Sequence, residues 1–321
     1  MRILENAVIA QHLWYKIGGT SRFLLKCENT EDILEAFQFI KKEKIKKFFI
    51  AGLGSNVLFP DGFFDGAVIQ ISSENTTQIS LVGKETLEVF AGVTLDQVIR
   101  FGFQHNLIGL EWAGGLPGTV GAAVRGNVGA FGGEIKDIFA GAEVLDASSK
   151  KLEVRRLTKR DIRFGYRSST IKKNPNLVVL SAKFKLVKVA DDRLARARQS
   201  YFANIEYRKL KHPMEFPSTG SAFKNISEPE NIEKILAVFP DIESDVRIKW
   251  HGKVSIGYLN KRLDLSGLQI GGAQISNKHS NFIVNTGGAT AADVNSIINK
   301  VQQTFQENFG FKPEPEVEIV Q

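Results

Sequence analysis

Cysteine is almost absent from this chain, since Cys27 is the only one among 321 residues. A single cysteine excludes an intramolecular disulfide and every zinc or iron–sulfur site built from several cysteines. No run of about 18 apolar residues occurs, which excludes a transmembrane helix. The first residues, 1–6, also lack the basic start and apolar core of a secretory signal peptide. We therefore expect a cytoplasmic protein that does not act at a membrane.

Histidine is also scarce, and the five histidines show no metal-ligand spacing such as HExxH, so we predict no metal site. The charge balance is 42 basic against 35 acidic residues, a net charge of +7 that attracts anions. The basic residues form only short clusters, at 41–47 and 208–211. Clusters of this length are typical of solvated helix faces, and we do not predict nucleic-acid binding.

Helix and strand signals alternate along the chain. A short apolar run at 47–51 predicts a strand, and 142–146 with 151–156 predict a hairpin. The segment 191–211 predicts a charged helix, and Thr290 with Asp293 predicts a capped helix that ends at Gly310. Prolines 213 and 217 indicate a boundary near residue 215. The pattern predicts an α+β fold with two or three domains.

A glycine loop follows the first predicted strand, with the sequence Gly52-Leu53-Gly54-Ser55-Asn56. Glycines allow backbone N–H groups to approach a pyrophosphate closely. The loop is not the Rossmann fingerprint, because Val57 occupies the place of the third glycine. By itself, the loop fits a tight turn as well as a dinucleotide site.

A second glycine-rich stretch is more informative, with nine glycines between residues 109 and 133. Such a density lowers stability through backbone entropy, and is best tolerated where the main chain wraps closely around a flat or anionic group. Two glycine loops in separate regions therefore indicate a large phosphate-containing cofactor, although packed turns would give the same composition.

Three further stretches carry polar residues: 164–169 (FGYRSS), 217–225 (PSTGSAFKN) and 313–317 (PEPEV). Taken singly, the arginine of the first stretch is typical of a surface residue, the serine of the second of a turn, and the glutamate of the third of a solvated carboxylate. Together with the glycine loops, the Trp14–Gly19 segment and Gly271–Ser276 with His279 and Asn281, they occur in a fixed order. In these motifs the chain resembles the UDP-N-acetylenolpyruvoylglucosamine reductase family over nearly its whole length.

The resemblance implies an FAD-binding fold of the vanillyl-alcohol-oxidase type. It implies two FAD-binding subdomains, 1–75 and 76–215, and a C-terminal α+β substrate-binding domain, 216–321, whose last segment returns to the active site. FAD would be bound non-covalently, with NADPH as co-substrate. The implied FAD contacts are Gly52, Gly54, Ser55, Asn56, Gly115, Pro117, Gly118, Val120, Gly121, Asn127 and Gly129.

The resemblance also implies three catalytic residues in the reduction of an enolpyruvyl sugar nucleotide. Arg167 would stabilise the growing charge of the substrate carboxylate, Ser221 would donate the proton to C2, and Glu316 would assist that developing acid. Lys211, Lys224 and Asn225 would contact the substrate. We expect a monomer whose partners are UDP-N-acetylenolpyruvoylglucosamine and NADPH.

Some positions depart from the family pattern. The short separation between Arg167 and Ser221 is typical of the subclass without a substrate-clamping tyrosine loop, so neither Tyr201 nor Tyr207 receives a role. Residues 228–253 fit poorly and read as an insertion, and Arg125 replaces a more usual apolar residue. Two other hypotheses remain: an oxygen-using flavoprotein of the same fold, and a non-enzymatic binder of nucleotides or nucleic acid.

Overall fold

Two compact units make up the computed structural model, which describes residues 1–148 and 151–321. Unit 1 contains Met1–Ala7, Ser21–Leu53 and Phe64–Leu210, and unit 2 contains Val8–Thr20, Gly54–Phe63 and Lys211–Gln321. Two short N-terminal segments therefore cluster with the C-terminal part of the chain. The division into three domains stays a prediction.

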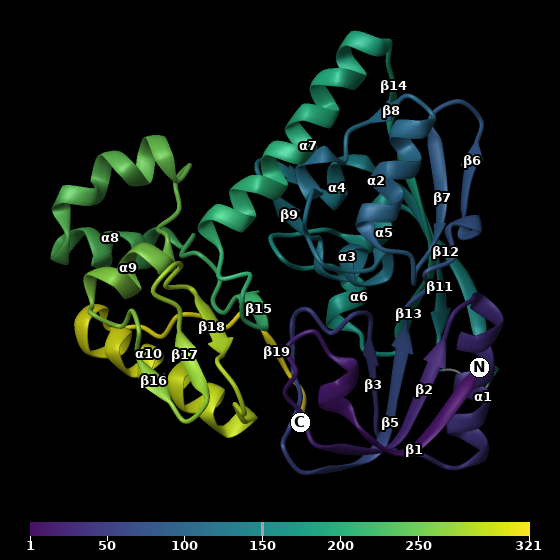
Figure 1. Ribbon diagram of the computed structural model, residues 1–321, viewed down its shortest axis with the longest axis horizontal. Helices are drawn as coiled ribbons and strands as arrows, with labels where there is room; N and C mark the ends of the chain where they lie inside the picture. The colour runs from purple at the N-terminus through teal and green to yellow at the C-terminus, as the bar shows by residue number, and fades with distance from the viewer. Residues whose placement is uncertain (149–150) are drawn as a thin grey trace. The chain divides into compact units, whose positions relative to one another are not determined.

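The first sheet of unit 1 has four strands in the order β1, β2, β5, β3, spanning Arg2–Val8, Thr20–Cys27, Phe63–Ile71 and Phe48–Ala51. Strands β3 and β5 run parallel. Helix α1 (Thr30–Lys42) lies beside this sheet (Figure 1). Its buried side chains, among them Ile33 and Phe37, belong to the same hydrophobic core as the buried residues of the strands. The apolar residues on one face of the helix thus pack against the sheet.

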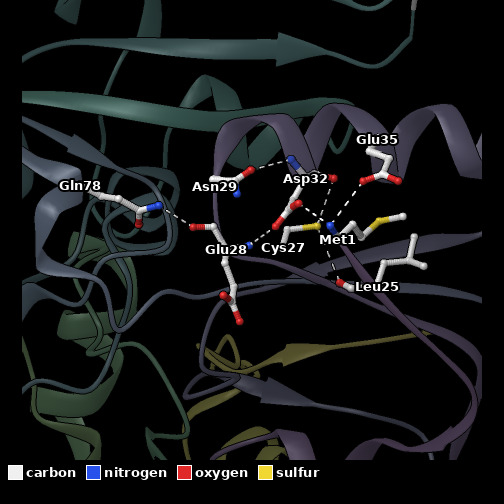
Figure 2. A network of polar contacts seen from close by, with 8 residues as sticks. All are labelled: Met1, Leu25, Cys27, Glu28, Asn29, Asp32, Glu35 and Gln78. Atoms are coloured by element: carbon white, nitrogen blue, oxygen red, sulfur yellow. Dashed lines mark hydrogen bonds and ion pairs between the residues drawn. The ribbon is translucent and has the colours of Figure 1, made fainter.

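A polar network holds the N-terminal end of α1 (Figure 2). The Asn29 side chain caps the helix by accepting a hydrogen bond from the Asp32 amide at 2.8 Å. The Asp32 carboxylate accepts a second bond from the Glu28 amide at 2.9 Å and pairs with the amino group of Met1. Cys27 belongs to this network through a contact from its thiol to the Asp32 carbonyl at 3.5 Å, and burial raises the pKa of that thiol to about 12. Cys27 is therefore a buried, protonated thiol.

The second sheet of unit 1 is antiparallel, in the order β12, β11, β13, β7, β6, spanning Glu153–Leu157, Phe139–Asp146, Leu177–Lys185, Thr86–Phe90 and Ile79–Val82. Strands β11 and β12 confirm the predicted hairpin, although loop residues 149 and 150 lie outside the described residues. Two small pairs accompany this sheet: β8 (Leu107–Ile108) with β14 (Val187–Lys188), and β9 (Gly129–Ala130) with β10 (Gly133–Glu134).

The helices of unit 1 vary widely in length. Their bounds after α1 are Leu95–Gln104 (α2), Val120–Gly126 (α3), Ile135–Ile138 (α4), Lys159–Ile162 (α5), Thr170–Lys173 (α6) and Asp191–Lys211 (α7), with short 3-10 turns η2 (Thr76–Gln78) and η3 (Glu111–Ala113). Helix α7 begins and ends at the predicted residues. Its last residue, Lys211, is also the first residue of the third segment of unit 2.

Unit 2 is built around an antiparallel sheet in the order β15, β18, β17, β16, spanning Ser218–Ser221, Phe282–Asn285, Ala273–Ile275 and Gln269–Ile270. Helix α10 (Ala291–Phe309) contributes its buried face to the same core. It has the predicted capping box of Thr290 with Asp293, and Gly310 ends it at φ 75°. The expectation for this helix is confirmed.

The remaining elements of unit 2 come from both ends of the chain. They are η1 (Ile9–His12), β4 (Val57–Leu58), α8 (Pro229–Val238), η4 (Pro240–Ile242), the π-helical turn η5 (Asp245–Lys249), α9 (Ile256–Arg262) and β19 (Glu318–Ile319). Strands β4 and β19 pair in parallel. Tyr15, Ile17 and Leu58 are buried in the core of this unit, which explains why the N-terminal segments belong to it.

Candidate functional site

Gly52, the first residue of the first glycine loop, meets the second glycine-rich stretch inside unit 1. Gly52 follows β3, and a Cβ atom there would lie 2.4 Å from Oγ1 of Thr119, the residue that precedes α3. Any side chain at Gly52 would therefore force the loop and the start of α3 apart. This glycine is required by the close approach of two protein segments.

Part of the second glycine stretch is engaged with the protein backbone. The amide of Val120 donates to the Val93 carbonyl and that of Gly121 to the Ala91 carbonyl, each at 2.8 Å. A Cβ on Gly121 would lie 3.0 Å from the Ala91 side chain. Val120 and Gly121 thus hold the start of α3 against the segment 91–93, which directly follows β7, and their amides cannot also bind a phosphate.

The amides just before α3 are different. In the part of the chain that the structure describes, the N–H groups of Gly115 and Gly118 have no protein acceptor, and both residues are partly exposed. Gly115 has a φ of 72°, a left-handed conformation that favours glycine. Neighbouring backbone amides of this kind suit the oxygens of a pyrophosphate.

Arg208, on α7, is a buried cation beside Gly114 and Gly115, and the sequence interpretation missed it. Its Nε donates to the Gly114 carbonyl at 2.9 Å, and its Cδ lies 3.1 Å from where a Cβ of Gly115 would be. The residue is only 7% exposed, and Nη2 has no hydrogen-bond partner among the described residues. Burial lowers the pKa of Arg208 to about 10, which still leaves it charged at neutral pH.

An uncompensated buried guanidinium is unfavourable unless an anion approaches it. Arg208 with the Gly115 and Gly118 amides therefore fits an anionic cofactor such as a flavin dinucleotide. The sequence offered only a weak signal for Arg208, which stands three residues before Lys211 in a short basic cluster that read as a solvated helix face. Its burial depends on tertiary packing.

Arg167 lies in a tight turn between β12 and β13. The backbones of Gly165 and Ser168 bond to each other at 2.9 and 3.2 Å, and Arg167 has a φ of 52°. Its Nη2 donates to the Gly129 carbonyl at 2.7 Å, and its own carbonyl accepts from Nζ of Lys172 at 3.1 Å. The guanidinium is thereby directed toward the β9–β10 hairpin.

Asn127 fixes this hairpin against the arginine turn. It is fully buried with a φ of 44°, and its Nδ2 donates to Glu134 and to the Gly165 carbonyl, both at 2.9 Å. Its Oδ1 accepts from the Lys136 amide at 3.0 Å. Burial raises the pKa of Glu134, but hydrogen bonds from Lys136 and Asn127 outweigh that effect and hold it below its usual range. The side chain of Asn127 is occupied by the protein.

In unit 2, the structure brings Ser221 and Glu316 onto neighbouring segments. Ser221 ends β15, and the next residue, Ala222, accepts a hydrogen bond from the Glu316 amide at 2.8 Å. The Ala222 amide donates to the Asn281 carbonyl at 2.7 Å. The Asn281 side chain also bonds both backbone groups of Phe223, at 2.9 and 3.1 Å. Pairing on both sides therefore fixes the backbone beside Ser221.

Three of the predicted cofactor residues, Gly54, Ser55 and Asn56, belong to unit 2. Gly54 has a φ of 66°, and a Cβ there would lie 2.4 Å from the side chain of Leu13. Asn56 donates from Nδ2 to the carbonyl of Glu316 at 3.0 Å. Asn56 thus holds the glutamate segment in place just before β4 pairs with β19.

The predicted substrate residues differ in their surroundings. The side-chain ammonium of Lys224 pairs with the Glu314 carboxylate. The backbone amide of Lys224 donates to the Glu314 carbonyl at 3.0 Å. Asn225 accepts from the Ile256 amide at 3.3 Å, at the start of α9. Lys211 is exposed at the end of α7. Two of the three therefore have structural contacts of their own.

No group of three or more His, Cys, Asp or Glu side chains could hold a metal ion within residues 1–148 and 151–321. The same residues include no helix with the length and apolar character needed to cross a membrane. Pro117, the remaining predicted cofactor residue, lies in the loop between Gly115 and Gly118 and is partly exposed.

Comparisons with known proteins match this chain to two domain families and to curated relatives. Residues 21–155 match the FAD binding domain, and residues 212–320 match the C-terminal domain of UDP-N-acetylenolpyruvoylglucosamine reductase. The reductase of Caldicellulosiruptor saccharolyticus is 34% identical over 100% of this chain and 92% of its own length. That of Clostridium perfringens is 32% identical over 99% of this chain and 93% of its own.

A solved structure has the same fold throughout. The crystal structure of UDP-N-acetylenolpyruvylglucosamine reductase from Thermus caldophilus is similar with a TM-score of 0.74 and 27% identity, and the match covers 100% of both chains. The expected α+β fold with an FAD-binding part is confirmed. On these grounds the chain belongs to the UDP-N-acetylenolpyruvoylglucosamine reductase family.

Proposed function

We propose that this protein reduces UDP-N-acetylenolpyruvoylglucosamine to UDP-N-acetylmuramate in peptidoglycan precursor synthesis, with FAD as cofactor and NADPH as hydride donor. The observation that carries the proposal is Arg208, a buried guanidinium whose Nη2 lacks a partner among the described residues. It lies beside Gly115, whose amide, like that of Gly118 in the same loop, has no protein acceptor in that part of the chain. A chain with this cluster and an FAD-binding domain is expected to bind an anionic flavin dinucleotide.

Arg208, Gly115 and Gly118 would hold the anionic part of FAD, and Gly52 with Thr119 would shape the adjoining loop. The bound flavin supplies hydride transfer from NADPH to C3 of the enolpyruvyl group. Arg167 would bind the substrate carboxylate, because a planar guanidinium matches a carboxylate whose charge grows during the reaction. The Gly129 carbonyl orients that guanidinium through its 2.7 Å bond to Nη2.

Ser221 would donate the proton to C2, so that one hydride and one proton complete the reduction. A serine hydroxyl is a weak acid, but an enolate is basic enough to take its proton at short range. Glu316 would share a hydrogen bond or proton with the developing acid, and it is held by Ala222 and Asn56 on neighbouring segments.

Lys211, Lys224 and Asn225 would contact the sugar diphosphate, with Lys224 exchanging its partner Glu314 for substrate. Residues 1–75 and 76–215 would serve FAD binding and residues 216–321 substrate binding. We propose that the protein works as a cytoplasmic monomer, with NADPH and the enolpyruvyl sugar nucleotide as its partners and without nucleic acid or membrane.

The test is an anaerobic visible spectrum of the purified protein. The flavin band should bleach with NADPH and return when UDP-N-acetylenolpyruvoylglucosamine is added. A flavin that is reoxidised only by oxygen would instead establish an oxidase. A colourless protein that also takes up no added FAD would contradict both activities.

A further inference from the structure

Two aromatic rings, those of Phe131 and Tyr207, form an exposed corner on unit 1. Their centroids are 5.4 Å apart and the ring planes meet at 88°. Phe131 is 47% exposed and Tyr207 is 48% exposed, so each presents much of its ring to solvent. Aromatic side chains left this open are candidates for ligand contact.

The backbone at Phe131 is in an unfavourable conformation. Phe131 and Gly132 form the two-residue turn between β9 and β10, with φ values of 48° and 84°. Gly132 adopts this left-handed region readily, but a phenylalanine does so at a cost in free energy. Burial does not offset that cost, because the ring remains half-exposed. Backbone strain of this kind is characteristic of binding sites.

The corner adjoins the residues assigned to cofactor and substrate. The Arg208 guanidinium lies over the Phe131 ring, with Cζ 5.0 Å from the centroid. Two residues before Phe131, the carbonyl of Gly129 accepts the hydrogen bond from Arg167. Phe131 therefore connects, within one hairpin, the buried cation and the arginine that we assign to the substrate carboxylate.

We propose that Phe131 and Tyr207 form a notch that binds the planar heteroaromatic ring of a nucleotide entering the site. Because the two rings are nearly perpendicular, a third ring can stack on one of them while the other meets its edge, which are both favourable aromatic geometries. Arg208, which we assign to the phosphates of FAD, lies over the Phe131 ring and so connects the notch to the cofactor site. The inference rests on the proposed function, in which both NADPH and the UDP-linked substrate carry such a ring.

The experiment uses the FAD-loaded protein and measures the two half-reactions separately by anaerobic stopped flow. Phe131→Gly and Tyr207→Ala should raise the half-saturating nucleotide concentration about tenfold or more, the scale of base stacking on an aromatic side chain. Limiting rates should change much less, since the hydride and proton donors are untouched. Phe131→Tyr, which keeps a ring in the turn, should restore the affinity lost in Phe131→Gly.

The arms of the experiment identify the ring. A change confined to flavin reduction by NADPH assigns the notch to that nucleotide, and a change confined to reoxidation assigns it to the uracil of the substrate. A change in both supports a shared subsite. Unchanged half-saturation in both half-reactions would overturn the proposal.

Two controls separate this outcome from misfolding and from failure of the proposed function. Phe202→Ala removes a 58% exposed ring from the same helix, α7, and should leave both half-saturation values unchanged. Phe131→Gly should melt no lower than the wild type, because it relieves the left-handed strain. If the wild type catalyses neither half-reaction, the proposed function fails. Calorimetric titration of the same variants with UDP and with NADP⁺ then still shows whether Phe131 and Tyr207 bind a nucleotide ring.

Discussion

Both units position a proposed catalytic side chain with one buried asparagine, but they do so by different physical means. In unit 1, Asn127 joins the Gly165 carbonyl, the Lys136 amide and the charged Glu134 while its own backbone is left-handed. In unit 2, Asn281 bonds both backbone groups of a single residue, Phe223, much as a neighbouring strand would.

The difference shows what each position depends on. The turn that carries Arg167 relies on a charged partner and a left-handed residue, so its order depends on electrostatics and on a conformation that few residues adopt. The segment that carries Ser221 relies on backbone pairing with Asn281 on one side and Glu316 on the other. Its order therefore depends on sheet-like hydrogen bonds.

The largest expected effect separates the chemistry of the two units. Ser221→Ala should slow flavin reoxidation by the enolpyruvyl substrate about 10²–10⁴-fold, the range of general acid catalysis. Flavin reduction by NADPH should be unchanged, because no proton from Ser221 enters that step. Anaerobic stopped flow measures both rates in one preparation. An equal decrease in both rates would contradict the assignment of Ser221 as the proton donor.

The next effect compares the two asparagines directly. Asn127→Ala and Asn281→Ala should each lower the free energy of unfolding by about 2–4 kcal/mol, because each leaves several buried polar groups without a hydrogen-bond partner. Urea unfolding followed by circular dichroism measures this. Asn127→Gly should be less harmful than Asn127→Ala, because glycine accepts the φ of 44°. At Asn281, which carries no such strain, glycine should give no advantage; an advantage there would contradict the distinction between the two units.

A smaller effect tests the glycine loop of unit 1. Gly52→Ala should cost about 1–3 kcal/mol and weaken FAD retention, because its Cβ would lie 2.4 Å from Oγ1 of Thr119. Adding Thr119→Ala removes the clash and should recover part of the loss. Gly62→Ala in unit 2 is the matched control, since nothing lies within 4 Å of that position. A Gly52→Ala protein as stable and as yellow as wild type would mean that the two segments move apart freely.

The smallest effect concerns pH and unit 2. Burial lowers the pKa of His279, so the folded protein takes up its proton less readily than the unfolded chain. Stability is therefore complete above the unfolded pKa, near 6.5, and falls as the pH drops from there toward the lower folded pKa. His279→Gln should flatten this fall by at most about 1.4 kcal/mol per pH unit, measured as urea midpoints between pH 7 and 5. An unchanged slope would show that His279 does not titrate on unfolding.

Local signals predicted much of the fold. Helix α7 has the predicted bounds, and the Thr290 cap with Gly310 fixes α10, because capping depends on residues only a few positions apart. The sequence interpretation did not foresee that residues 8–20 and 54–63 join the C-terminal unit. That assignment depends on Tyr15, Ile17 and Leu58 packing against residues more than 150 positions away, which no local pattern records.

The sequence motifs led to site residues, but they did not reveal the contacts that these residues make. The resemblance implied catalytic roles for Arg167, Ser221 and Glu316, which stay predictions, and the structure places the last two on adjoining segments. It did not reveal that the amides of Val120 and Gly121 and the side chain of Asn127 are already bonded to protein. It also missed Arg208, because charge alone does not distinguish a buried guanidinium from a solvated one.

The pairing of β4 with β19 has a consequence for how this protein is made. Asn56 and Glu316 are 260 positions apart, so the segment that carries Glu316 is fixed only when residues near 57 meet residues near 318. Contacts this distant form slowly, and on the ribosome they cannot form until the later residues have been synthesised. Until then, the N-terminal segments of unit 2 lack their packing partners, and Tyr15 and Leu58 stay exposed to solvent. Chaperone dependence during synthesis should therefore concentrate on unit 2, and recovery of activity after refolding should lag behind recovery of helix α7.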